Sequence, residues 1–465
     1  MSVSRTTAVA LAAGLLLSAC TAGGGEGPGG GQTPAVVPVV IDTDVGSDDV
    51  MAVLYLLSRP DIEVKAITVS GTGLAHCEPG VRTVLGLLEL VAAPDVPVAC
   101  GRETPLGGAN AFPEEWRAGA DAGYGLELPT TDRQPAEVDA VSVLSSAIRG
   151  ADQPTLVALG PLTNVAEAFA EDPSLAREVE AVFAMGGALR APGNVGANPQ
   201  AEWNFHADPR AVDMVLRSGA EVTLVPLDMT NAVPVTGYFA DALAGHHVTP
   251  QADAVLALFE HDPRLVEPGF FFWDPLAAVL SVEGVPATFE RERVVVLEGS
   301  TDVDGELVLS SAGVEVRVAS TGDPLAFETE FLNTLNGDEA IASTRPAPDL
   351  TFTLVADGCT GTVPTSLPAG TIDVAVENPL DVGGGVALAT TANGHPIEEL
   401  VAFVEGLEAA PTDEPPPWIV GEAWVDAAPG STTLSPWELA PGQHAVVCVG
   451  ESGSVRLAGV IDVEV

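Results

Sequence analysis

Four aspartates fall within eight residues near the start of the chain: Asp42, Asp44, Asp48 and Asp49. No lysine or arginine lies between Arg5 and Arg59, so no basic side chain nearby in sequence relieves their repulsion. Crowded like charges favour a bound cation. Carboxylate oxygens are hard ligands that suit Ca²⁺ or Mg²⁺ better than a soft metal, and we expect Ca²⁺. Helix capping is the alternative, but it would account for only one or two of the acids.

The residues around these acids predict a turn from a buried strand into a helix. Val39–Ile41 is apolar and reads as the end of a strand. Apolar residues then recur at the spacing of one helix face: Val50, Val53, Leu54 and Leu57. In an open α/β sheet, such a turn lies at the carboxyl edge of the strands, where ligands bind.

Strand-like and helical patterns alternate along the first half of the chain. The apolar runs of strand length are Val64–Val69, Val96–Ala99, Thr155–Leu159, Ala181–Met185 and Val222–Leu227. This order predicts an α/β domain with a mostly parallel sheet and helices on both faces. The segment from Arg102 to Arg133 is rich in Gly and Pro, so we expect an irregular loop that serves as a lid or a binding wall.

Composition divides the chain into four parts. Residues 1–20 have the pattern of an export signal, and its last four residues, Leu-Ser-Ala-Cys, resemble a bacterial lipobox with Cys20 as the lipidated residue. Residues 21–36 form a Gly-rich tether, 37–340 the α/β domain, and 348–465 a β-sandwich of short runs separated by Gly and Pro. We therefore expect an exported lipoprotein, anchored to the membrane at the cell surface. An ordinary cleaved signal peptide with a chance cysteine is the alternative.

The charge balance bears on partners. The 465 residues include 65 acidic and 18 basic side chains, for a formal net charge of −47. Such a chain is repelled by phosphate backbones, so we expect no nucleic-acid partner. The hydrophobic fraction of 46% suffices for a sizeable core. The sequence leaves open whether the protein forms a homo-oligomer.

Four further cysteines can pair in an exported protein. They allow three pairings, and their placement in separate domains favours Cys77 with Cys100 and Cys359 with Cys448. Buried free thiols remain an alternative for the first pair.

The motif Asp-Thr-Asp-x-Gly-x-Asp-Asp after an apolar strand resembles the signature of the nucleoside hydrolases, the inosine–uridine preferring family of calcium-dependent N-ribohydrolases. The likeness extends over roughly residues 37–337. It implies a Ca²⁺ cofactor and hydrolysis of the N-glycosidic bond of ribonucleosides to ribose and free base by metal-activated water, a step of nucleoside catabolism. By the same resemblance, Asp44 would bind the metal and act as general base, and Asp49 would be a ligand. Asp42 would bind the metal or contact one of its ligands, and Asp48 would accept hydrogen bonds from ribose hydroxyls.

Two downstream positions match the rest of the family's metal site. The backbone carbonyl of Leu159, just before Gly-Pro-Leu-Thr-Asn, lies where the family provides a main-chain ligand. Asp274, in Phe-Trp-Asp-Pro, matches the final carboxylate ligand.

A second block resembles the family's ribose-binding segment and begins at Met185 in Met-Gly-Gly. By this resemblance, Asn204 would hold the 2′ and 3′ hydroxyls, while Glu202 and Asn194 would hold the 5′ hydroxyl. The segment before Glu202 is longer than usual, which makes Asn198 a rival for Asn194.

The chain departs from the family pattern at Trp273 and at Thr72. Trp273 stands where many members carry His, and resembles the purine-specific branch, which stacks the base between aromatic rings. Trp116 is the candidate for the opposite ring, with core packing as the alternative. Thr72 replaces an Asn that commonly contacts the sugar. We expect His76, nearby, to be a capping or surface residue.

The C-terminal sandwich weakly resembles a cupredoxin fold, through Ser366–Thr371, His395 and Leu439–Cys448. A blue-copper centre needs two His, a Cys and usually a Met, and no His or Met follows Cys448, so we expect a sandwich without copper. An alternative function for the whole chain is a non-catalytic, calcium-dependent surface protein that binds nucleosides or sugars. The joint presence of the acidic cluster, Asn204 and Asp274 argues against it, because binding alone needs no positioned base.

Overall fold

The computed structural model describes residues 36–266, 269–300, 302–337, 348–356, 358–380, 382–407, 416–427, 432–450 and 454–464. The expected signal peptide, Cys20 and all but the last residue of the tether lie outside these residues. Of the helices in the described segments, none combines the length and the apolar character needed to cross a bilayer.

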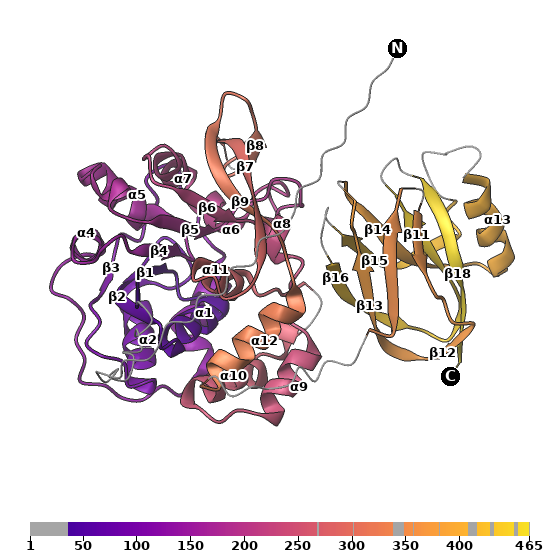
Figure 1. Cartoon of the computed structure of the whole chain (residues 1–465), viewed down its shortest axis with the longest axis horizontal. Helices are drawn as coiled ribbons and strands as arrows, with labels where there is room; N and C mark the ends of the chain where they lie inside the picture. The colour runs from indigo at the N-terminus through magenta and orange to yellow at the C-terminus, as the bar shows by residue number, and fades with distance from the viewer. Residues whose placement is uncertain are drawn as a thin grey trace, which may run out of the picture. The chain divides into compact units, whose positions relative to one another are not determined.

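A nine-stranded sheet organises the larger part of the chain (Figure 1), in the order β3-β2-β1-β4-β5-β6-β9-β7-β8. Its first six strands in sequence are β1 (Val37–Thr43), β2 (Ile62–Val69), β3 (Val98–Cys100), β4 (Thr155–Ala158), β5 (Ala181–Met185) and β6 (Val222–Val225). Every pairing from β3 across to β9 is parallel. The prediction of a mostly parallel sheet is therefore confirmed.

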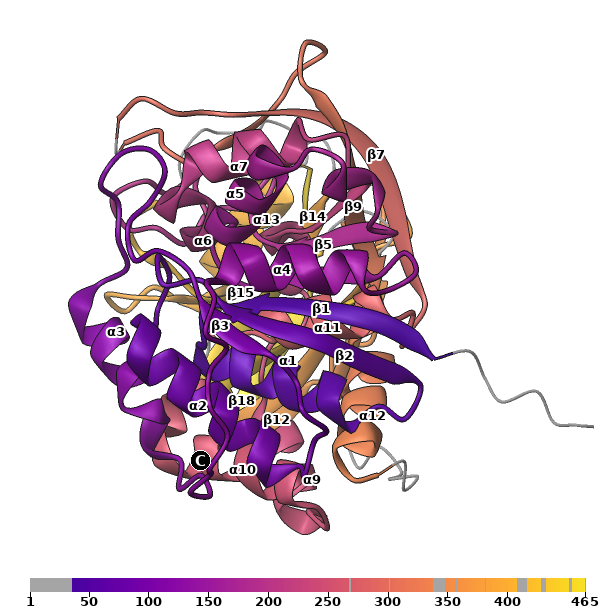
Figure 2. The same ribbon diagram turned by 90° about the vertical axis from the view of Figure 1, so that its left-hand side faces the viewer.

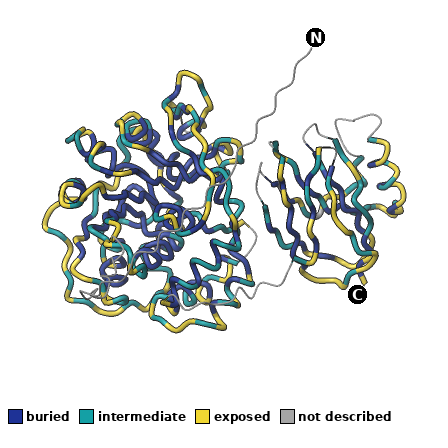
Figure 3. The backbone as a smooth tube through the Cα atoms, in the orientation of Figure 1, coloured by how far each residue is buried: buried dark blue, intermediate teal, exposed yellow. Residues whose placement is uncertain are grey.

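Helices cover both faces of this sheet, as expected (Figure 2). One face carries α1 (Ser47–Ser58), α2 (Cys77–Leu90), α10 (Pro250–His261), α11 (Trp273–Ser281) and α12 (Pro324–Leu335). The other carries α4 (Ala140–Arg149), α5 (Thr163–Glu171) and α7 (Pro209–Leu216). Each layer buries its own apolar cluster against the strands, and the buried residues fill the interior in Figure 3.

Several elements were not expected from sequence. The sheet ends in antiparallel strands: β9 (Val314–Gly322) pairs with β7 (Ala287–Val296), which pairs with β8 (Leu307–Leu309). The segment 102–133 is not wholly irregular, because it contains α3 (Glu114–Asp121) and the 3-10 turn η1 (Gly123–Gly125). Two glutamates in the first turn of α3 favour the positive end of a helix, which Gly and Pro content concealed. Short connecting helices complete this part: η2 (Leu175–Arg177), α6 (Trp203–Ala207), α8 (Leu227–Thr230), α9 (Gly237–Gly245) and η3 (Pro263–Val266).

The C-terminal part forms two sheets around one apolar core, in the orders β11-β10-β13-β16 and β12-β18-β17-β14-β15. Its strands are β10 (Leu350–Val355), β11 (Gly358–Gly361), β12 (Ser366–Pro368), β13 (Gly370–Glu377), β14 (Gly384–Thr391), β15 (Ile419–Ala427), β16 (Thr432–Leu439), β17 (Gly442–Val449) and β18 (Val455–Glu464). One helix, α13 (Ile397–Leu407), also lies in the described residues of this part. The boundaries of this domain stay a prediction.

Both favoured cysteine pairings are present. Cys77 is bonded to Cys100, and Cys359 to Cys448. The second bond joins β11 to β17, which belong to different sheets. Its sulfur atoms are therefore committed to each other, and Cys448 offers no thiolate to a copper ion.

Candidate active site

The turn between β1 and α1 is tightly built. Val45 has a φ of 63°, a left-handed conformation that is unusual for a β-branched residue. A side-chain carbon at Gly46 would lie 2.8 Å from Asp49 Oδ2 and 2.9 Å from Asp48 Oδ1, so this position has no room for a side chain. Backbone strain of this kind clusters at functional sites, where the surrounding structure enforces it.

Asp49 closes the turn from within helix α1. Its carboxylate accepts hydrogen bonds from the hydroxyl of Thr43, the backbone amide of Asp44 at 3.0 Å and that of Gly46 at 2.9 Å. Part of its role is therefore the helix cap that local sequence also predicts.

Capping does not account for the partners that Asp49 meets across the fold. Ligand atoms of Asp48, Asp49 and Asp274 all lie within 4.8 Å of one another. Asp274 is the second residue of α11, and its Oδ1 is buried with no hydrogen-bond partner among the described residues. Burial, and next the charge of Asp49, raise the pKa of Asp274 well above its usual range. The same two causes raise the pKa of Asp48 to about 7.

Asp44 borders this cluster and is held by the segment that follows β2. The backbone amide of Leu74 donates to Asp44 Oδ2 at 3.1 Å, and the amide of Ala75 donates to the Asp44 carbonyl at 2.9 Å. A side-chain carbon at Gly73 would lie 2.1 Å from Asp44 Oδ2, so the backbone itself packs on the carboxylate. Burial, followed by the charge of Asp49, raises the pKa of Asp44 well above its usual range.

Asp42 is fully buried and held by two side chains. Thr68 Oγ1 donates to its Oδ1 at 2.6 Å, and Asn164 Nδ2 donates to the same oxygen at 2.8 Å. Its Oδ2 is buried without a partner in the described part of the chain. Burial raises the pKa of Asp42 to about 7, against the opposing effect of these two hydrogen bonds.

These acids fit a hard divalent cation. The ion pairs seen in the described ranges leave all five aspartates without Lys or Arg: Asp42, Asp44, Asp48, Asp49 and Asp274. Buried carboxylates are costly unless a positive charge or a proton compensates them. Two buried oxygens without partners and an all-oxygen donor set are what Ca²⁺ or Mg²⁺ would complete.

The carbonyl of Leu159 adjoins the same region. The Leu159 amide donates to the Asp42 carbonyl at 2.8 Å, which fixes β4 beside β1. Asn204 Nδ2 donates to the Leu159 carbonyl at 2.7 Å and to that of Met185 at 3.2 Å. A carbonyl oxygen has two lone pairs, so Leu159 keeps capacity for a second partner.

The expected ribose residues lie on α6 and the loop before it. Both oxygens of Glu202 accept backbone amides: Oε1 from Asn204 at 2.8 Å, and Oε2 from Gly187 at 3.0 Å and Phe205 at 3.2 Å. Burial raises the pKa of Glu202 to about 7, and these amides oppose the rise. Glu202 is therefore a helix cap as well as a candidate sugar ligand.

The structure separates the two rival asparagines of this loop. Asn194 is exposed, and its Oδ1 accepts the backbone amide of Trp203 at 3.1 Å. Asn198 is buried, and its Nδ2 donates to the carbonyl of Asp304 at 3.3 Å. The side chain of Asn194 thus contacts Trp203, between Glu202 and Asn204, whereas the side chain of Asn198 contacts Gln200 and Asp304.

Trp116 and Trp273, expected to face each other across the base, each pack on other aromatic rings. Trp116 is 46% exposed and meets the edge of Trp203, with ring centroids 5.3 Å apart, while Phe112 stacks on Trp203 at 5.2 Å. Trp273, partly buried beside Asp274, packs on its own neighbour Phe270 at 4.9 Å. Sequence reasoning overlooked Trp203, although its position between Glu202 and Asn204 was a usable signal.

Tyr124 was also overlooked as a neighbour of the acids. Its φ is 52°, and it stands between Gly123 and Gly125, which also have positive φ. Burial, and next the charges of Asp44, Asp48 and Asp49, raise the pKa of Tyr124 well above its usual range. The triplet Gly-Tyr-Gly in the expected lid segment was the available signal.

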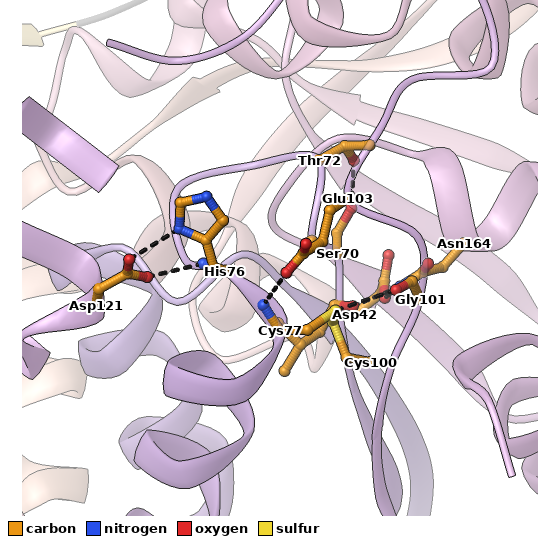
Figure 4. Close-up of a disulfide and its surroundings, with 12 residues drawn as sticks. Asp42, Ser70, Thr72, His76, Cys77, Cys100, Gly101, Glu103, Asp121 and Asn164 are labelled. Carbon is orange, nitrogen blue, oxygen red and sulfur yellow. Dashed lines mark hydrogen bonds and ion pairs between the residues drawn. A yellow bond between two sulfur atoms is a disulfide. The ribbon is translucent and has the colours of Figure 1, made fainter. Parts of the chain in front are cut away.

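Thr72 and His76 each have defined hydrogen-bond partners. Thr72 Oγ1 lies 2.8 Å from Thr163 Oγ1, whose hydroxyl donates to Asp208 Oδ2 at 2.8 Å. The residue that replaces the family's Asn is thus turned into a buried hydroxyl network. His76 precedes α2, and its ring lies 2.8 Å from Asp121 and points away from Asp42 (Figure 4), in agreement with a surface role.

Known proteins resemble the chain over its α/β part. The sequence profile described as inosine-uridine preferring nucleoside hydrolase matches residues 39–329. Uridine nucleosidase 1 of Arabidopsis thaliana is 36% identical over 199 residues, and the match spans 43% of this chain but only 58% of that protein. A solved plant nucleoside hydrolase gives a TM-score of 0.59 at 29% identity, covering 65% of this chain and 99% of that one. A purine-preferring ribonucleoside hydrolase from Gardnerella vaginalis gives 0.57 at 27%, covering 66% and 100%.

Proposed function

This chain belongs to the inosine-uridine preferring nucleoside hydrolase family, and we propose that it hydrolyses the N-glycosidic bond of ribonucleosides to ribose and a free base. The supporting observation is the convergence of Asp274 with Asp48 and Asp49 within 4.8 Å, from helices more than two hundred residues apart in sequence. The fold is that of the solved nucleoside hydrolases, and the family is metal-dependent.

The ion that suits this site is Ca²⁺. Asp42, Asp44, Asp49, Asp274 and the Leu159 carbonyl would hold it, since all offer hard oxygen donors around buried, uncompensated acids. When bound, Ca²⁺ supplies the positive charge that keeps the carboxylates ionised and polarises the attacking water.

Asp44 serves as general base. Its carboxylate is held in place by the Leu74 amide, and the bound cation would keep it ionised so that it can accept a proton from water. Water then attacks the anomeric carbon as the nucleobase departs, through an oxocarbenium-like transition state.

The sugar is held from two directions. Asp48 accepts ribose hydroxyls from the side of the acids, while Asn204 holds the 2′ and 3′ hydroxyls from α6. Glu202 and Asn194 hold the 5′ hydroxyl. The contacts of Asn204 with Leu159 and Met185 support this placement, because they tie the sugar side to the metal side.

The base is a purine by preference. Trp273 beside Asp274 and Trp203 between two sugar ligands offer flat surfaces that favour a large planar base. The solved hydrolase named as purine-preferring agrees with this preference, whereas relatives named as uridine nucleosidase or pyrimidine-specific do not. The likeness to a uridine nucleosidase makes uridine the competitor to test.

The setting is the cell surface. The export pattern, the lipobox-like Leu-Ser-Ala-Cys and the Gly-rich tether support a lipoprotein anchored through Cys20. Globomycin-sensitive processing and palmitate labelling of the wild type, lost in Cys20→Ala, would test this anchor; unlabelled wild type would refute it.

Catalysis is tested by ribose release from inosine, adenosine, guanosine, uridine and cytidine, with Ca²⁺ or with excess EGTA. Asp44→Asn should lower kcat by about 10³-fold, whereas Asp152→Asn, an exposed residue far along the chain, should leave it unchanged. EGTA should abolish turnover. Absence of ribose from every nucleoside would refute the hydrolase, and saturable nucleoside binding without ribose would favour the non-catalytic alternative.

A further inference from the structure

The disulfide between Cys77 and Cys100 closes the loop that packs on Asp44. Strand β2 ends at Val69, which pairs in register with Cys100, the last residue of β3. Residues 70–76 follow, and the chain then reaches Cys77, which is bonded to the same Cys100, with 5.4 Å between the Cα atoms. Both ends of loop 70–76 are therefore fixed to one residue.

This loop supplies the groups that hold Asp44. The amides of Leu74 and Ala75 donate to the Asp44 carboxylate and carbonyl, and the backbone at Gly73 packs directly on the carboxylate. Displacement of the loop would therefore free a buried carboxylate that its neighbours repel.

Gly101, the residue after Cys100, is linked to a second acid, Asp42, through Asn164. Gly101 donates to the Val69 carbonyl at 3.0 Å, and a side-chain carbon there would lie 1.8 Å from Asn164 Oδ1. Asn164 in turn donates to Asp42 Oδ1 at 2.8 Å. Figure 4 shows the disulfide, Gly101, Asn164 and Asp42 along this path.

We infer that the Cys77–Cys100 disulfide is a positioning element of the metal site, which holds loop 70–76 on Asp44 and Gly101 against Asn164. The inference rests on the calcium site proposed above. Four neighbouring carboxylates repel each other before the ion binds, so the unloaded site needs its surroundings to be fixed. Groups that orient metal ligands typically contribute 10- to 100-fold to metal affinity.

The chain contains its own matched control. Cys77→Ala/Cys100→Ala and Cys359→Ala/Cys448→Ala each remove one disulfide, but the second bond lies between the strands of the C-terminal sandwich. Calorimetry with Ca²⁺ on chelator-stripped full chain would measure affinity. Amide hydrogen exchange without Ca²⁺ would follow the amides of Leu74 and Ala75.

We expect about tenfold weaker Ca²⁺ binding and faster exchange at Leu74 and Ala75 in the first double variant only. Unchanged affinity and exchange in that variant, while the wild type binds Ca²⁺, would overturn this inference alone. A wild type that binds no Ca²⁺ would refute the proposed function and the inference with it.

A variant that does not fold would be replaced by partial reduction of folded wild type. Alkylation and mass spectrometry would identify chains in which Cys77 and Cys100 are alkylated while the bond between Cys359 and Cys448 is intact. These chains should show the same loss of affinity and the same faster exchange, and wild-type values in them would refute the inference.

Discussion

Replacing Asp42 with asparagine should stabilise the calcium-free chain at alkaline pH, although it removes a proposed ligand. The carboxyl group is fully buried, and burial raises its pKa to about 7 from an ordinary value of 3.8. Above pH 7 the folded chain must hold a buried negative charge that the unfolded chain exposes to water. The neutral amide avoids this cost.

The sign and size of this effect on the free energy of unfolding follow from the pKa of Asp42 in the folded and in the unfolded chain. Between pH 3.8 and 7 the folded chain keeps a proton that the unfolded chain has lost, so stability falls as pH rises through this window. The raised pKa of Asp42 destabilises the folded chain by about 2 kcal/mol at pH 5 and by about 4 kcal/mol at pH 8. The asparagine still accepts from Thr68 and Asn164, but its new amide donor lacks a partner, which costs about 1–3 kcal/mol at both pH values.

Urea unfolding in EGTA at pH 5 and pH 8 measures the difference. The free energy of unfolding of Asp42→Asn relative to wild type should rise by about 2–3 kcal/mol between the two pH values. Asp152→Asn, exposed in the structure, should follow the wild type at both. An unchanged or falling difference for Asp42→Asn would refute the assignment of a raised pKa to this buried carboxyl. Added Ca²⁺ should stabilise the wild type more at pH 8 than at pH 5.

Two further predictions concern catalysis. Gly73→Ala should lower kcat/KM by about 100-fold, because the added carbon would overlap Asp44. The control Gly237→Ala, where the added carbon would meet nothing within 4 Å, should have no effect on ribose release. Equal activities of the two variants would contradict the packing of loop 70–76 on Asp44. Trp273→Ala should raise KM for inosine about tenfold, as expected for loss of one stacking surface, and raise KM for uridine less; equal changes would remove the argument for purine preference.

The acidic turn could be predicted because its information is local. An apolar strand, a short turn and a helical stripe specify where Asp42, Asp44 and Asp49 lie relative to one another. The same local rules predicted the parallel strands, whose apolar runs are buried on both faces. The contribution of Asp274 came instead from a resemblance, since no spacing rule joins residues so far apart.

The features that sequence reasoning missed depend on tertiary contacts or unusual backbone. Strand β7 buries only Val294 and Val296, and its first seven residues are mostly polar, so it lacks the long apolar run that reveals a buried strand. Trp203 acquires its partners, Phe112 and Trp116, only when a distant segment folds over α6. Tyr124 approaches the acids through a left-handed conformation that propensity does not predict. The roles of the site residues remain predictions.

The most direct measurement is a parallel titration of Ca²⁺ binding and ribose release from inosine on chelator-stripped chain. Activity should rise from zero in proportion to the occupancy of one Ca²⁺ site. Asp274→Asn should shift both curves together to higher Ca²⁺. Full activity in the presence of excess EGTA, or Ca²⁺ binding that Asp274→Asn leaves unchanged, would contradict the assignment of this cluster as the catalytic metal site.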